Sequence, residues 1–119
     1  MSEDIKSQLR EAIEKSKGWA NTGWEVTFGP HRHPVNNITE AKDLPRNHPN
    51  RQEAQAYWRN VELIGKDVST NLEAALAELE SGNVKGATTK AYTAQYVEKP
   101  LEHITNTSKP VFAALQALG

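Results

Sequence analysis

The sequence predicts an all-α protein, a bundle of three or four helices built on a long antiparallel helical hairpin. Apolar residues recur at alternating steps of three and four over two long segments, as on one face of a helix. A short turn at residues 81–83 separates these segments, which favours an antiparallel pair. The 119-residue chain also contains 14 alanines, and alanine has the highest helix propensity of all residues.

The first arm of the hairpin is predicted at about residues 50–81. Asn50, with Glu53 three residues later, resembles a capping box and predicts where this helix begins, and Gly82 predicts where it ends. At a rise of 1.5 Å per residue the arm should be roughly 45 Å long. Its apolar face comprises Ala54, Tyr57, Val61, Ile64, Val68, Leu72, Ala75 and Leu79.

The second arm is predicted at about residues 83–107. Pro100 lies inside it and lacks an amide donor, so we expect a kink or break near residues 96–100. Tyr92 and Tyr96 lie off the apolar face, and we expect them either to meet the outer helices or to form a second contact surface. The apolar face comprises Val84, Ala87, Ala91, Ala94, Val97, Leu101 and Ile104.

Two shorter helices and a long connection complete a single helical domain over residues 1–119. We expect the short helices at about residues 3–17 and 109–118, because both segments show helical apolar spacing. The connection at residues 18–49 is rich in glycine and proline, with one helical turn expected at residues 39–44. Within it Trp24, Val26 and Phe28 alternate as in an extended segment.

Composition limits the classes of function. The formal net charge is −1 and the pI about 6.4, so nucleic acid is an unlikely partner. No stretch approaches the roughly 18 apolar residues of a membrane span, and the chain has no cysteine. We therefore expect a soluble, cytoplasmic protein without disulfides or thiolate metal sites.

The segment GPHRHPVNN (residues 29–37) suggests two interpretations. His31 and His33, with His48 further along the chain, could bind a divalent transition metal such as zinc, with Asp43 or Glu40 as an optional fourth ligand. Alternatively, the prolines stiffen a polar loop that happens to contain imidazoles. The second interpretation is favoured, because the histidine spacing lacks a predicted helix or strand to hold it.

The sequence contains no motif that indicates an enzyme. A phosphate-binding glycine loop, a nucleophile elbow and the Glu-x-x-His pairs of metal-binding bundles are all missing from it. The prediction is therefore a non-enzymatic protein without a cofactor, with metal binding by the three histidines as the alternative.

The favoured functional hypothesis is a small adaptor or regulator that binds another protein through its helical hairpin and the 19–49 loop, as a homodimer. Charge is uneven, at +2 over residues 31–59 and −4 over residues 60–80. Arginine and tryptophan are typical of interface hot spots. The candidate partner-binding residues are Trp19, Trp24, Arg32, Arg46, Arg51 and Arg59. The same four arginines would carry the other alternative, a nucleic-acid-binding regulator.

Overall fold

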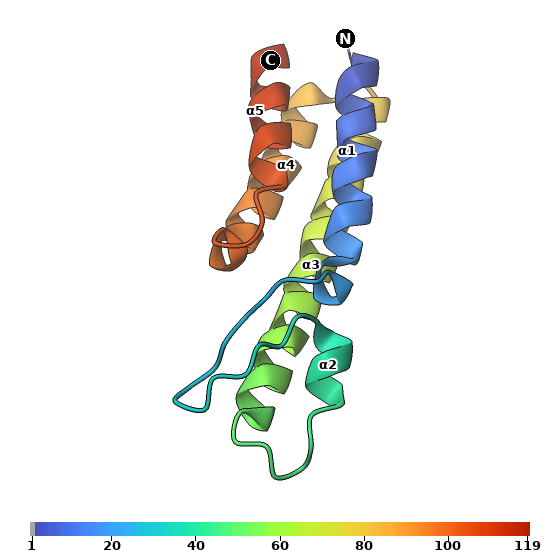
Figure 1. Ribbon diagram of the computed structural model, residues 1–119. Helices are drawn as coiled ribbons and strands as arrows, with labels where there is room; N and C mark the ends of the chain where they lie inside the picture. Colours follow the sequence, from blue (N-terminus) through green and yellow to red (C-terminus); the bar gives the residue numbers. More distant parts are fainter. Residues whose placement is uncertain (1) are drawn as a thin grey trace.

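The protein is an elongated bundle of α-helices (Figure 1), and a computed structural model describes its residues 2–119. None of the described residues lies in a β-strand, which confirms the all-α class. The described part measures 54 × 19 × 18 Å. Five helices form it, which are α1 (Ser2–Lys17), α2 (Ile38–Lys42), α3 (Arg51–Glu80), α4 (Val84–Glu98) and α5 (Ser108–Leu118).

The long helix α3 and the helix α4 form an antiparallel pair. Gly82 has a φ of 86°, which lets the chain reverse between them, since glycine tolerates the left-handed region. Asn83 caps α4, and its side chain accepts a hydrogen bond of 2.9 Å from the amide of Gly86. Ala87, Ala91 and Ala94 of α4 are fully buried.

The second arm is shorter than predicted, because α4 ends at Glu98 instead of near residue 107. A 3₁₀ turn (Lys99–Leu101) follows and contains Pro100, which cannot continue the α-helical hydrogen bonds. The predicted break near residues 96–100 is thus confirmed. The chain then turns back, and α5 packs along α4.

Helices α1 and α4 pack along one half of α3, and α5 packs on α4 and α1 (Figure 1). Helix α1 crosses α3 closely at Gly65, where a Cβ atom would clash with the carbonyl oxygen of Ser16. Trp19, in a 3₁₀ turn (Trp19–Asn21) directly after α1, packs over the same glycine. Glycine is therefore required at this crossing for steric reasons.

The connection covers the other half of α3. Trp24, Val26 and Phe28 are half-buried and alternate with exposed residues, which confirms the predicted extended segment. This segment pairs with its own return path, since the amide of Val35 donates to the carbonyl of Val26 at 2.9 Å. The predicted helical turn is α2, which Asn37 caps by accepting a hydrogen bond from the amide of Glu40. Among the described residues, no helix has the length and apolar character needed to cross a membrane.

Candidate functional site

The three histidines of the predicted metal site lie in the connection, but only two are close together. The rings of His33 and His48 have centroids 4.7 Å apart. The backbone carbonyl of His31 accepts a hydrogen bond from the side chain of Asn50. In the described part of the chain, no group of three or more His, Cys, Asp or Glu side chains has an arrangement that could hold a metal ion.

Asn50 anchors this loop and does not form the predicted capping box. Its side chain makes no hydrogen bond to the start of α3. Instead its Nδ2 donates to the carbonyls of Phe28 at 2.6 Å and His31 at 2.9 Å. Its backbone amide donates to Nδ1 of His48 at 3.0 Å. The capping-box prediction is wrong because the asparagine side chain satisfies loop carbonyls 19 and 22 residues away in sequence.

Trp58 provides a second anchor for the connection. It is completely buried, and its indole Nε1 donates to the carbonyl of Val35 at 3.1 Å. A buried tryptophan needs such a partner for its N–H group. Asn50 therefore holds the connection at residues 28 and 31, and Trp58 holds its return path at residue 35.

The two tryptophans predicted to bind a partner differ in exposure. Trp19 is 3% exposed and belongs to the core, so it does not contribute to the molecular surface. Trp24 is half-buried. Both line a cavity of about 310 Å³ near Ile104. Their main role in this structure is to close the bundle between α1 and the segment before α5.

Two of the four candidate arginines, Arg32 and Arg46, lie in the connection, and the other two lie on α3. Arg32, Arg46 and Arg59 are exposed, and Arg51 is half-buried. Arg51 and Arg59 lie on α3 about 12 Å apart along its axis, at 1.5 Å per residue. Arg59 borders a small cavity of about 170 Å³. None of the four takes part in an ion pair within the described residues.

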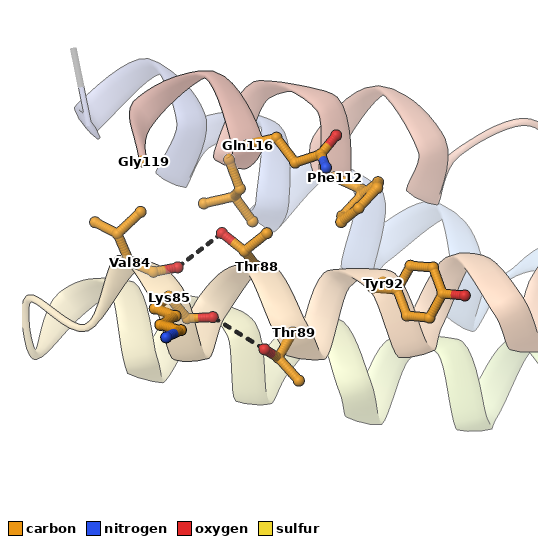
Figure 2. Close-up of a pocket in the computed structure, with 9 residues that line it drawn as sticks. Val84, Lys85, Thr88, Thr89, Tyr92, Phe112, Gln116 and Gly119 are labelled. Carbon is orange, nitrogen blue, oxygen red and sulfur yellow. Dashed lines mark hydrogen bonds between the residues drawn. The ribbon is translucent and has the colours of Figure 1, made fainter.

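A concave surface larger than both of these cavities lies elsewhere, between α4 and α5 (Figure 2). It has a volume of about 710 Å³ and opens to solvent. We call it the α4–α5 groove. Its lining residues are Val84, Lys85, Thr88, Thr89, Tyr92, Phe112, Leu115, Gln116 and Gly119.

The surface of the α4–α5 groove is mainly apolar. Tyr92 is 55% exposed, and its ring packs against Phe112 with centroids 5.5 Å apart. The hydroxyls of Thr88 and Thr89 donate to the carbonyls one turn earlier on α4, at 2.8 and 3.1 Å (Figure 2). These hydroxyls are therefore already satisfied, and the threonine methyl groups remain for contact with a ligand. Lys85 is the only charged side chain in the lining.

A buried carboxylate at the end of α4 holds the start of α5. Glu98 is 4% exposed and accepts hydrogen bonds from the amides of Thr107 at 2.9 Å and Ser108 at 2.8 Å, and from the hydroxyl of Thr105. These amides lie at the start of α5, where a helix has unsatisfied donors and a positive dipole end. Glu98 thus fixes α5 beside α4 and positions both walls of the groove.

The sequence indicates part of this surface but not the groove. The position of Tyr92 and Tyr96 outside the alanine stripe predicts either contact with the outer helices or a second contact surface. Tyr92 packs against Phe112 of α5, and Tyr96 is 69% exposed. Phe112 was assigned only to a short terminal helix. Its position opposite Tyr92 follows from the turn at residues 99–107, whose course the sequence pattern did not predict.

Comparisons with known proteins give no family for this chain. No protein-family model, curated protein or solved structure matches it. The functional argument therefore rests on the residues and geometry described above.

Proposed function

We propose that this protein is a non-enzymatic protein–protein interaction module that binds its partner in the α4–α5 groove. The observation that supports this most directly is the open apolar groove of about 710 Å³ with the exposed aromatic side chain of Tyr92 at its wall. Aromatic residues are enriched at interfaces, and the centres of interfaces contain few charges.

The charge content of the outer helices supports the same proposal. Helix α1 packs on α3 from outside and has eight charged residues among its 16, as is usual for a helix that faces water. Helix α5 is also an outer helix, yet only Lys109 is charged among its 11 residues. Its exposed side instead contains Pro110, Ala113 and Ala117. A solvent-facing helix with so few charges is typical of a surface that another molecule covers.

A groove-blocking variant tests this proposal. Thr89→Arg places a long side chain in the groove, and arginine is a good helix former. Thr70→Arg is the matched control, because Thr70 is also exposed on a helix and its hydroxyl also donates to the carbonyl four residues earlier. Proteins captured from the native source by wild type should be captured by Thr70→Arg and lost with Thr89→Arg. Retention of the same proteins by Thr89→Arg would rule out the groove as the binding surface.

Metal binding has weaker support as a second function. The adjacent rings of His33 and His48 supply two imidazoles, whereas a zinc site uses three or four protein ligands. Elemental analysis of protein purified without a histidine tag tests it, with His33→Ala as the control. Homo-oligomerisation also remains a prediction, and light scattering over a range of protein concentrations tests it.

A further inference from the structure

We infer that the α4–α5 groove accepts an amphipathic helix of a partner protein, whose apolar face is flanked at both ends by acidic residues. This inference rests on the proposed function and adds the chemistry of the partner. It depends on the shape of the groove, on the apolar side chains at its centre and on the lysines at its two ends.

The groove has the shape and length for a helix. Two antiparallel helices, α4 and α5, form its walls, and a third helix can pack between such a pair. The lining runs on α4 from Val84 to Tyr92, which is about 12 Å or two helical turns at 1.5 Å per residue. A partner helix would therefore place three or four apolar side chains, at steps of three and four, against Tyr92 and Phe112.

Lysines lie beyond both ends of this apolar centre. Lys85 and Tyr92 are seven residues apart on α4 and therefore share one side of it, and Lys99 follows seven residues later, directly after the last residue of α4. Lys109 precedes Phe112 by three residues on α5, and it lines the same small crevice as Lys99. None of these lysines takes part in an ion pair within the described residues.

Few carboxylates are present to neutralise these lysines. Residues 84–119 contain only Glu98 and Glu102 as acidic side chains. Glu98 is buried and accepts hydrogen bonds from the start of α5, and Glu102 is exposed in the crevice that Lys99 and Lys109 also line, so one exposed carboxylate there is outnumbered by two lysines. Lys85 and Lys99 are about 21 Å apart along α4, at 1.5 Å per residue. Acidic residues about 14 positions apart on the partner helix would match this separation.

Two other occupants fit the groove less well. A second copy bound to the same groove through a two-fold axis across α4 would bring Lys85 near Lys99 of its mate, and such like charges repel. A single-stranded nucleic acid would stack on Tyr92 and Tyr96 and place phosphates near the lysines, but it has no aliphatic side chains to fill the centre of the groove at Val84 and Leu115. An acid-flanked helix satisfies both the apolar centre and the basic ends.

Three labelled synthetic peptides test the inference. Each has about 15 residues, or roughly 22 Å of helix. The first has leucines on one face and glutamates at both ends, the second replaces the glutamates by lysines, and the third replaces the leucines by serines. Anisotropy should show that the first peptide binds on the order of ten-fold more tightly than the second, because three surface ion pairs each contribute about two- to three-fold. The third should bind much more weakly than the first.

Salt and charge reversal provide the controls. The preference for the acidic peptide should shrink at about 0.5 M salt, where exposed charges are strongly screened. The double change Lys85→Glu and Lys99→Glu should reverse the preference. Lys90→Glu should leave it nearly unchanged, because at about 100° per residue Lys90 lies on the far side of α4 from Tyr92. Thr89→Arg should weaken binding of the basic peptide more than that of the acidic peptide, because the new guanidinium both fills the groove and repels lysines.

Several results would overturn the inference. These are equal affinity for the acidic and basic peptides, no peptide binding, tighter binding of a labelled oligothymidylate, or concentration-dependent dimerisation that Thr89→Arg abolishes. If partner capture from the native source depends on Thr89 while the peptides show no charge preference, only this inference fails. If capture is independent of Thr89, the proposed function itself fails.

Discussion

Removal of the Glu98 carboxylate should loosen α5 and destabilise the whole bundle. The carboxylate is 4% exposed and satisfies the amides of Thr107 and Ser108 and the hydroxyl of Thr105. Glu98→Ala would leave two backbone donors at the start of α5 without their partner. Because α5 packs on α4 and α1, its loss would also remove one wall of the groove.

The expected size of the effect follows from these three hydrogen bonds. Loss of a helix N-terminal cap costs about 1 kcal/mol, and a buried donor left unsatisfied costs about 1–3 kcal/mol. The cost of burying the carboxylate offsets part of what its bonds contribute. We therefore expect Glu98→Ala to lower the free energy of unfolding by about 3 kcal/mol, and Glu98→Gln, which keeps one acceptor oxygen, by about 1.5 kcal/mol.

Urea unfolding monitored by circular dichroism measures this change. The midpoint should fall in the order wild type, Glu98→Gln, Glu98→Ala, with a similar dependence of the free energy on urea. Glu102→Gln is the matched control, because Glu102 is an exposed carboxylate nearby, and it should change stability by less than about 0.5 kcal/mol. If both Glu98 variants unfold within that margin of wild type, the structural role assigned to this carboxylate is wrong.

Three further predictions concern the rest of the fold. Gly65→Ala should lower the free energy of unfolding by about 1–2 kcal/mol, because its Cβ would press on the backbone of Ser16. The control Asn60→Ala, at an exposed position of the same helix, should raise it by a few tenths of a kcal/mol, and urea unfolding of both variants measures the difference. Asn50→Ala should lower the free energy of unfolding by about 2 kcal/mol and speed amide hydrogen exchange in the connection. Unchanged exchange would contradict the anchoring role of Asn50. Burial raises the pKa of Tyr57 above its ordinary value near 10. Its contribution to stability is then fully present below pH 10 and is lost as the pH rises through the folded-state pKa, so alkaline unfolding should begin at higher pH for Tyr57→Phe than for wild type.

The helices were predictable because their signals are local. The apolar period of α3 runs from Ala54 to Leu79, about seven turns at 3.6 residues per turn, so the signal that predicts this helix lies within its own segment. Pro100 predicts the end of α4 from its own covalent structure. The alternation of Trp24, Val26 and Phe28 likewise predicts the extended segment.

The errors arose where a polar side chain had a choice of partners. The spacing of Asn50 and Glu53 indicated a capping box, but the asparagine bonds to Phe28 and His31, which only the folded connection brings to it. Trp19, in the glycine-rich connection, was predicted to bind a partner. In the structure it is buried over Gly65, a contact with a residue far away in the sequence.

The sequence by itself determined the helical class, the long first arm, the break at Pro100 and the position of Tyr92 and Tyr96 outside the alanine stripe. These features depend on periodicity and backbone chemistry, which operate over a few residues. Only the tertiary structure decided that the histidine loop is held by Asn50 and that α5 returns along α4 to form the groove. Those outcomes depend on hydrogen bonds and packing between residues distant in the chain, such as Glu98 with Ser108, whose pairing no local pattern specifies.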